Sequence, residues 1–313
     1  MKRRSHRLRP GTLVPIAFGL ALLAVTGSSR DLEARRVSDW FQAENLGPDV
    51  NSAFEDFAPH LSGDGLALYL TSNRPESLGG EDLWVARRAS RHDAWGPATN
   101  LGPAINTGAN ERSPSLSGNG RLLFFATDRP GGSGGFDIWL SWRPDPDDDA
   151  GWQPPVNVGT GINSAATDAG PSFLEHRAPL RMPQLFFGSG RPGGAGGLDI
   201  YVGSVPGGWS GPPLLVAELS SPQLDVTPAV RRDGLEIIIG STRAGTLGGL
   251  DLWRSARKAI DSPWSAPESL GPTINTEFLE AYPALSSDGG TLLFQSTRPG
   301  GFGGSDLYMS TRQ

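Results

Sequence analysis

The chain has 313 residues, among them 43 Gly, 27 Pro, nine Trp and no Cys, and its formal net charge at pH 7 is −6. So many helix-breaking residues argue against long helices, whereas a hydrophobic share of 37% suffices for a core and argues against a disordered chain. The lack of Cys excludes disulfides, thiolate metal sites and a cysteine nucleophile.

The N-terminus has the pattern of a signal peptide. Residues 1–10 carry five Lys and Arg and no acid, and residues 11–27 are apolar without any charge. We predict a signal peptide over 1–27, either cleaved or kept as an N-terminal anchor, then a short linker over 28–39. The protein is therefore expected to be periplasmic or secreted, touching a membrane only through an uncleaved N-terminal segment.

The rest of the chain is distinctly acidic, because residues 1–27 hold five of the 27 Lys and Arg and none of the 33 Asp and Glu. This charge disfavours nucleic acid as a partner. It also disfavours anionic lipid surfaces, and is compatible with cations or a basic protein patch.

A single pattern repeats five times after residue 40. Each copy has a Pro, an Arg fifteen residues later (twenty in the third copy), an Asp eight residues after the Arg, and an aromatic residue two further on. The Pro series is Pro59, Pro114, Pro171, Pro228 and Pro283. The Arg and Asp series are Arg74 and Asp82, Arg129 and Asp137, Arg191 and Asp199, Arg243 and Asp251, and Arg298 and Asp306.

The local signals within each copy are those of short strands. Asx-Gly pairs such as Asp64-Gly65 separate short apolar runs and predict tight hairpins in which both turn residues have positive φ. A glycine-rich turn, a third strand and a fourth strand opened by a Trp follow in each repeat. Four antiparallel strands in about 55 residues are typical of a propeller blade.

The two ends of the repeat region complete one another. Residues 40–56 contain the signals of a fourth strand only, and the last copy stops at Gln313 after its third strand. We therefore predict an all-β, five-bladed β-propeller over 40–313. Its blades are four-stranded and antiparallel, and its ring is closed by the N-terminal strand pairing with the C-terminal blade.

The repeated phrases SxRPGGxGGxDLW and PxLSxDG resemble the TolB-type, WD-like β-propeller repeats of exported bacterial proteins. This resemblance covers nearly the whole chain after the signal segment. It implies a propeller fold and, since TolB itself is similar to a six-bladed ring with an additional N-terminal domain, it implies no direct Tol-system role.

Most of the repeated polar residues are expected to be structural. We expect each Arg to hold the Asp eight residues later across the glycine-rich turn. A second Trp series is expected to pack between blades; its members are Trp40, Trp95, Trp152, Trp209 and Trp264. The segment Asp145–Asp149 is expected to be an acidic surface loop.

An acid lies three residues before each Pro of the repeat, at Asp56, Glu111, Asp168, Asp225 and Glu280. Because the first strand of each propeller blade lines the central channel, these acids would form a ring near one mouth. Such a ring, with His60 beside it, could bind a ligand or a hard cation such as Ca²⁺. The alternative is that each acid caps a turn or pairs with an Arg of a neighbouring blade. No other cofactor is expected, and a metal site built from His is not supported.

Residues that break the repeat are the better candidates for function. The first hairpin of the third copy is five residues longer, and Glu175, His176, Arg177 and Arg181 within it are candidates for contact with a partner. His60, Arg112 and Tyr282 fall on the channel side, where they could make the mouth specific.

No catalytic motif stands out, and nearly every polar position is repeated five times. The expected function is therefore an exported, monomeric, non-enzymatic binding or scaffold propeller that recognises a protein or a cell-envelope glycan by its channel mouth and loops. The alternative is a carbohydrate-active enzyme, similar to glycoside hydrolases, that uses channel carboxylates.

Overall fold

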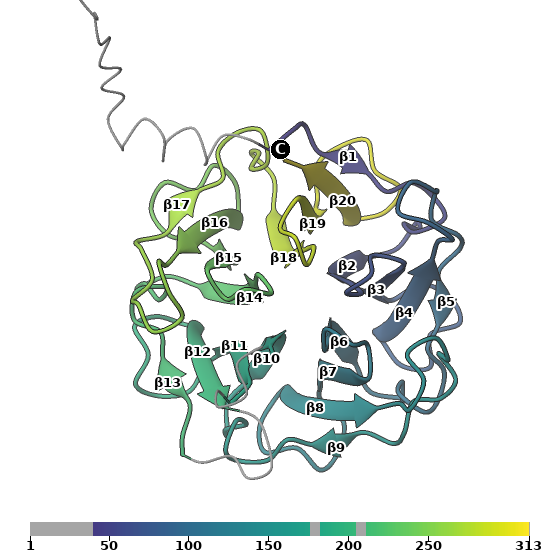
Figure 1. Cartoon of the computed structure of the whole chain (residues 1–313), viewed down its shortest axis with the longest axis horizontal. Helices are drawn as coiled ribbons and strands as arrows, with labels where there is room; N and C mark the ends of the chain where they lie inside the picture. Colours follow the sequence, from purple (N-terminus) through teal and green to yellow (C-terminus); the bar gives the residue numbers. More distant parts are fainter. Residues whose placement is uncertain (1–39, 176–181, 205–210, 313) are drawn as a thin grey trace, which may run out of the picture. The chain divides into compact units, whose positions relative to one another are not determined.

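The protein is an all-β propeller with five blades around a central axis (Figure 1). The computed structural model describes residues 40–175, 182–204 and 211–312. Every blade is a four-stranded antiparallel sheet, so the predicted fold class, blade number and strand number are confirmed. The predicted signal peptide and linker, residues 1–39, lie outside the described residues. In the described part of the chain, no helix has the length and apolarity that a membrane crossing requires.

The strands occupy four positions from the axis outward. The innermost are β2 (Asp56–Leu61), β6 (Glu111–Leu116), β10 (Asp168–Leu174), β14 (Asp225–Val230) and β18 (Glu280–Leu285). Next are β3 (Ala67–Ser72), β7 (Leu122–Thr127), β11 (Gln184–Ser189), β15 (Glu236–Ser241) and β19 (Thr291–Ser296). Third are β4 (Asp82–Arg87), β8 (Asp137–Trp142), β12 (Asp199–Ser204), β16 (Asp251–Ala256) and β20 (Asp306–Thr311). Outermost are β5 (Thr99–Asn100), β9 (Val156–Asn157), β13 (Leu214–Leu215), β17 (Glu268–Ser269) and β1 (Glu44–Asn45).

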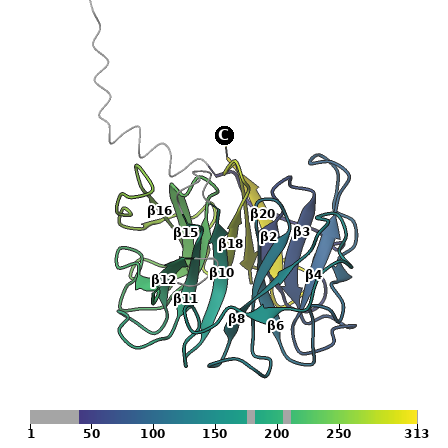
Figure 2. The same ribbon diagram turned by 60° about the horizontal axis from the view of Figure 1, so that its bottom comes forward.

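Loops gather at two opposite faces of the ring (Figure 2). We call the face where the innermost strands begin the loop face; it carries the glycine-rich turns and the connections between blades. The opposite face, where hairpins join the first two strands of each blade, is called the hairpin face.

The ring closes as predicted. β1 pairs with β20, with Glu44 opposite Met309, and Trp40 forms a bridge to Arg312. Trp40 is buried in a cluster with residues of the fourth and fifth blades. The N-terminal strand therefore supplies both hydrogen bonds and apolar packing to the last blade.

The Asx-Gly hairpins differ in detail from the prediction. Only the Gly has positive φ, 78° at Gly65, whereas Asp64 does not. The Gly65 N–H donates to the Ser62 carbonyl, and the Asp64 carboxylate accepts hydrogen bonds from Ser62 Oγ and Leu66 N. The side chain of Asp64 thus fixes a four-residue loop, 63–66, between Ser62 and Ala67 rather than a two-residue turn.

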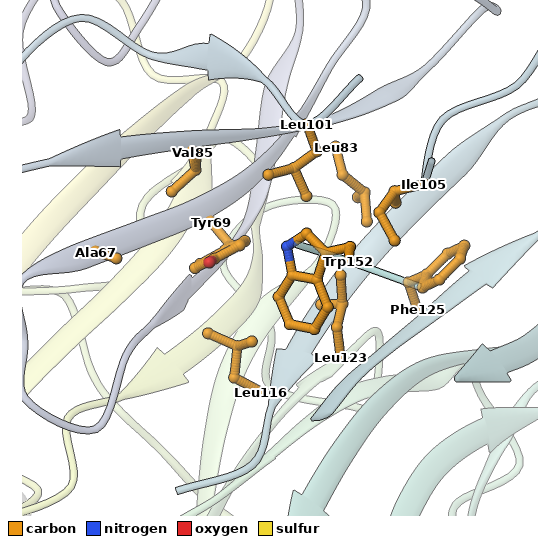
Figure 3. Close-up of a cluster of buried hydrophobic side chains, with 10 residues drawn as sticks. All are labelled: Ala67, Tyr69, Leu83, Val85, Leu101, Ile105, Leu116, Leu123, Phe125 and Trp152. Carbon is orange, nitrogen blue, oxygen red and sulfur yellow. The ribbon is translucent and has the colours of Figure 1, made fainter. Parts of the chain in front are cut away.

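The interfaces between consecutive blades, which we call seams, hold the hydrophobic core. Trp152 of the second blade packs among Tyr69, Leu83 and Val85 of the first and Phe125 of its own blade (Figure 3). Trp95, Trp264 and Trp40 are buried in the same way at other seams. The predicted packing of this Trp series between blades is confirmed for these four, and Trp209 lies outside the described residues.

The expected pairing of each Arg with the Asp eight residues later is wrong. Arg74 instead forms an ion pair with Asp56 at the start of its own blade. Asp82 accepts hydrogen bonds from the backbone N–H groups of Leu78 and Gly79 and from Asn100. The Asp series therefore binds the backbone N–H groups of the glycine-rich turns, while the Arg series binds the acids at the start of the blades.

The segment Asp145–Asp149 is more than a surface loop. Asp149 binds Arg143 of its own blade at 2.7 Å and Arg87 of the first blade at 2.6 Å, and it accepts a hydrogen bond from Tyr69. A carboxylate that joins three side chains of two blades is a seam contact, which a run of acids in a sequence does not reveal.

A second seam carboxylate, Glu236, is 1% exposed and contacts Arg231, Arg254 and Arg312 at 2.6 Å each. Burial alone would raise the pKa of Glu236, but hydrogen bonds and charge from Arg312 and Arg254 outweigh it and lower the pKa to about 2. Because the folded-state pKa lies below the ordinary value, this contribution to stability is complete above about pH 5 and is lost as the pH falls towards 2.

We therefore expect Glu236→Gln to lower the free energy of unfolding by about 3–5 kcal/mol at pH 7, since three arginines would lose their buried partner. The difference from the wild-type protein should shrink as the pH falls from about 5 towards 2. Urea denaturation at a series of pH values measures it, with the exposed Glu277→Gln as control. An equal loss at all pH values would contradict this account.

Ring closure gives a second prediction. A chain that begins at residue 48 lacks Trp40 and β1, and it should be less stable than one that begins at residue 39 by about 3–5 kcal/mol, the usual cost of losing a buried Trp. It should also associate with rising concentration, because the edge of β20 becomes free to pair. Denaturation and light scattering of the two chains test this; equal stability and a monomeric shorter chain would refute it.

Candidate functional site

On the hairpin face, the described hairpin tips of the first, second, fourth and fifth blades contact one another near the axis. A Cβ on Gly63 would lie 2.5 Å from the Gly118 carbonyl oxygen, so the hairpin tips of the first two blades touch. A Cβ on Gly118 would lie 3.0 Å from Arg232, which reaches there from the fourth blade. Ser287 of the fifth blade donates a hydrogen bond to the Gly63 carbonyl. A ligand therefore approaches the axis from the loop face.

The five repeated acids lie at the loop-face end of the innermost strands, but their side chains do not face the channel. Asp56, Glu111, Asp168, Asp225 and Glu280 are all 0% exposed. Each is paired with an Arg of its own blade, not of a neighbouring one: Arg74, Arg129, Arg191, Arg243 and Arg298 respectively. The ring of channel-facing carboxylates expected from the sequence is therefore not formed.

The hydrogen bonds of these acids explain their burial. Asp168 accepts from the Arg191 guanidinium at 2.7 Å and, through its second oxygen, from the backbone N–H and hydroxyl of Ser164. Ser189 Oγ donates to it as well. A buried carboxylate with an ion pair and three further donors has no free lone pair for a substrate, so these acids hold the loop that enters each blade.

The wall of the channel is built by the innermost strands and is mostly apolar or hydroxylated. Each of these strands has a bulge at its Pro, and the residue before the Pro has positive φ. These residues are Ala58, Ser113, Gly170, Thr227 and Tyr282. A Pro at a bulge of the innermost edge strand leaves no N–H for further pairing, so the lumen stays open.

Two ionisable side chains, His60 and Tyr282, are among the residues that line the described lumen, whose cavity is about 50 Å³. Burial lowers the pKa of His60 to about 4, so its imidazole is neutral at pH 7. Burial likewise raises the pKa of Tyr282. A cavity of this volume holds a few water molecules and is too small for a sugar ring.

A polar and aromatic cluster stands at the open mouth above this lumen. Arg112 lies 2.6 Å from the Glu81 carboxylate, and both side chains keep about a quarter of their surface exposed. The Arg112 guanidinium also stacks 3.9 Å from the centre of the Phe136 ring, and its charge opposes the rise in the pKa of Tyr282 that burial causes. The Tyr282 ring packs against Phe57 at 5.3 Å. Side chains of the first, second and fifth blades thus converge on one guanidinium.

A second carboxylate, Asp128, belongs to the same cluster. Asn110 donates to it through both its backbone N–H and its side-chain amide at 2.8 Å. These hydrogen bonds outweigh the effect of burial and lower the pKa of Asp128, to which the charge of Arg112 also contributes. Burial raises the pKa of Glu81 in spite of Arg112, and the charge of Asp128 adds to that rise. The two carboxyl groups therefore have pKa values displaced in opposite directions.

The cluster consists of residues that break the fivefold repeat. At the register of Glu81 the other blades have Phe136, Leu198, Leu250 and Ser305. At the register of Arg112 they have Phe57, Ala169, Val226 and Ala281. Sequence reasoning found Arg112 and Tyr282 but missed Glu81, Asp128 and Phe136, which a comparison of each repeat position for its odd member could have identified.

The predicted partner-contact residues of the third blade lie mostly outside the part of the chain that the structure describes. Glu175 is exposed at the end of β10, whereas His176, Arg177 and Arg181 lie outside the described residues. Among residues 40–175, 182–204 and 211–312, no group of three or more His, Asp or Glu side chains is arranged to hold a metal ion. Ca²⁺ binding and contact of this loop with a partner stay predictions.

Comparison with protein-family models gives no match, and comparison with the sequences of curated proteins gives none either. Solved structures of similar fold include an α-L-arabinofuranosidase of Lactobacillus brevis, with a TM-score of 0.58, 14% identity, and coverage of 86% of this chain and 92% of that one. A GH43 enzyme of Xanthomonas citri complexed with xylotriose has a TM-score of 0.57 and 15% identity, and the match covers 91% of this chain and 93% of that one. The catalytic domain of the GH62 α-L-arabinofuranosidase of Coprinopsis cinerea has a TM-score of 0.56 and 14% identity. The match covers 88% of this chain and 97% of that one.

At this level of identity the comparison shows a shared fold. It corrects two expectations from the sequence. The resemblance to TolB-type, WD-like repeats is wrong as an assignment, because no family model matches and the similar structures are GH43 and GH62 enzymes. The expected non-enzymatic binding or scaffold role is also wrong, because the solved structures of similar fold named above are enzymes, among them α-L-arabinofuranosidases.

Proposed function

We propose that the protein is a carbohydrate-active enzyme, similar to a glycoside hydrolase, whose site is the loop-face mouth of the channel. The observation that carries the proposal is the pair Glu81 and Asp128: Glu81 contacts the Arg112 guanidinium, Asp128 is influenced by the charge of Arg112, and the pKa values of the two carboxyl groups are displaced in opposite directions. Such a pair is what hydrolysis of a glycosidic bond needs, one carboxyl to donate a proton and one carboxylate to act as base or nucleophile.

Each group has a role that follows from its surroundings. Glu81, with its raised pKa, donates a proton to the leaving oxygen as the bond between that oxygen and the anomeric carbon breaks. Asp128, with its lowered pKa, stays ionised and takes a proton from the attacking water, or attacks the anomeric carbon itself. Arg112 positions Glu81 through their 2.6 Å contact.

The rings around the pair suit a sugar. Phe136 and Tyr282 are partly exposed at the mouth, and Phe57 supports Tyr282 from behind. Aromatic faces pack against the apolar C–H surface of a pyranose or furanose ring. Because the lumen below is too small for a sugar, the substrate would lie across the mouth rather than inside the channel.

The substrate class is taken from the proteins of similar fold, which include arabinofuranosidases and a protein complexed with xylotriose. Glycans containing arabinose or xylose are thus the first to test. Export, which residues 1–27 predict from their basic and apolar order, would bring the enzyme to polysaccharides outside the cytoplasm.

Purified protein should hydrolyse an aryl α-L-arabinofuranoside, an aryl β-D-xyloside or arabinoxylan oligosaccharides. Glu81→Gln and Asp128→Asn should each lower kcat/KM by about 10²–10⁴, the usual contribution of a general acid or base. Glu268→Gln, an exposed carboxyl change on β17, serves as control. Unchanged melting temperatures establish that the variants are folded. Full activity of Glu81→Gln, or no turnover of any of these substrates, would refute the proposal.

The pH profile gives a separate test. Activity requires protonated Glu81 and ionised Asp128, so the basic limb of kcat/KM should lie above the ordinary pKa of Glu. Arg112→Met removes a positive charge that favours the ionised form of Glu81, and should move the basic limb to higher pH. Asn110→Ala removes a hydrogen bond to Asp128 and should move the acidic limb to higher pH. Limbs that stay in place would contradict this assignment of acid and base.

A further inference from the structure

An arginine stacks on a buried Trp at four seams. Arg88 lies 4.2 Å from the Trp95 ring, and Arg143, Arg257 and Arg312 lie 4.2–4.5 Å from Trp152, Trp264 and Trp40. In each case the Arg Nε donates to the carbonyl of the hairpin Gly of the same blade. The four guanidinium groups therefore occupy the same place in their blades, fourteen residues after the Arg of the repeat.

At two seams this guanidinium is neutralised by a carboxylate of the protein. Arg312 binds Glu236 of the preceding blade through two nitrogens, at 2.6 and 2.8 Å. Arg143 binds Asp149 of its own blade at 2.7 Å. Both carboxylates are joined by at least one further arginine, Arg254 or Arg87. The place in front of the stacked guanidinium is thus an anion site that the chain itself fills.

The seam between the fifth and first blades lacks this carboxylate. Thr291 stands at the register of Glu236, seven residues before the Arg of the repeat. Among the residues that the structure describes, no Asp or Glu forms an ion pair with Arg88. Instead a pocket of about 240 Å³ opens on the hairpin face, lined by Arg88, Arg91, Trp95 and Thr291 among others.

We propose that this pocket binds the carboxylate of a small hydroxylated ligand, a sugar acid, with Arg88 and Arg91 as its cationic partners. The ligand carboxylate takes the place that Glu236 and Asp149 occupy at two of the other seams. A planar guanidinium that is stacked and fixed through Nε presents its remaining N–H groups to a carboxylate at little entropic cost.

The rest of the pocket fits a sugar ring. Trp95, Leu293 and Met309 give it apolar surface, while Thr291 and Thr311 offer hydroxyls. Its volume is below the range of drug-sized ligand sites and suits one small ring. Burial and the neighbouring charge of Arg91 lower the pKa of Arg88, so an anion between the two would relieve their repulsion. Asp288 is 3.8 Å from Arg91, with both side chains more than half exposed, and leaves most of that charge available.

The proposal is tested by calorimetric titration of the full chain with D-glucuronate and with D-glucose, which share the ring but not the carboxylate. Glucuronate should bind, and glucose should bind at least about tenfold more weakly. Arg88→Met, which keeps contact with Trp95 but removes the charge, should weaken glucuronate binding by a similar factor. Equal binding of the two sugars, unchanged binding by the variant, or no binding of glucuronate at millimolar concentration would each overturn the proposal.

A second variant tests the site by adding a carboxylate, so a loss of binding in it would not come from a loss of folded structure. Thr291→Glu places in the fifth blade the carboxylate that the fourth has at Glu236. It should raise the melting temperature by pairing with Arg88, and it should abolish glucuronate binding because the site is filled. Thr99→Glu, on the exposed edge strand β5, should do neither. Thr291→Glu protein that still binds glucuronate would refute the proposed site.

This site is independent of the proposed hydrolytic one, because it lies on the opposite face. Glu81→Gln should therefore bind glucuronate like the wild-type protein, and Thr291→Glu should keep the wild-type hydrolysis rate. Loss of glucuronate binding in Glu81→Gln would place the ligand at the loop-face mouth instead and would overturn the second site.

Discussion

The propeller depends on one buried ion pair per blade, between the carboxylate at the start of the innermost strand and the Arg that follows the second strand. The carboxylate has no exposure, and its other oxygen holds the loop arriving from the preceding blade. Where the acid is Asp the loop hydroxyl comes from Ser, at Ser52, Ser164 and Ser221; where it is Glu it comes from Thr, at Thr107 and Thr276. Each pair joins two strands and one inter-blade connection, so removing a single partner leaves a buried charge and a loose loop together.

This use of the repeated acids decides where chemistry can occur. The five equivalent carboxylates are buried and hydrogen-bonded within their blades, so they are structural. The groups that a ligand can reach are those that break the repeat. Glu81 and Arg112 stand where other blades have apolar or small residues at most positions, and Tyr282 is the bulkiest of the five residues that precede the channel Pro. The same logic holds on the hairpin face, where a seam that lacks its carboxylate opens into a pocket. In this protein, the side chains that break the repeat are the ones that remain available for binding or catalysis.

Much of the architecture could be predicted from the sequence because each repeat fixes its own elements. The Pro of the innermost strand, the Trp of the seams and the unmatched ends predict blades, core and closure with no alignment. Partners separated by a strand could not be predicted. Arg74 is eight residues from Asp82 and eighteen from Asp56, and only the antiparallel pairing of β2 with β3 brings the distant one close. Of the mouth, Arg112 and Tyr282 were predicted because they differ from their equivalents, whereas Glu81 and Asp128 lie in turns whose approach to Arg112 is set by tertiary packing.

The pairing of β1 with β20 also determines the order in which the molecule can be completed. The two strands come from opposite ends of the chain, and Asn45 lies opposite Tyr308. During synthesis, the first strand to emerge has no partner until the last strand has followed it. Local hairpins can form early because their contacts are short in sequence, but the ring closes last, across the greatest loop entropy in the molecule. A chain that lacks β1 is thus left with an open sheet edge on β20, which favours association with other chains.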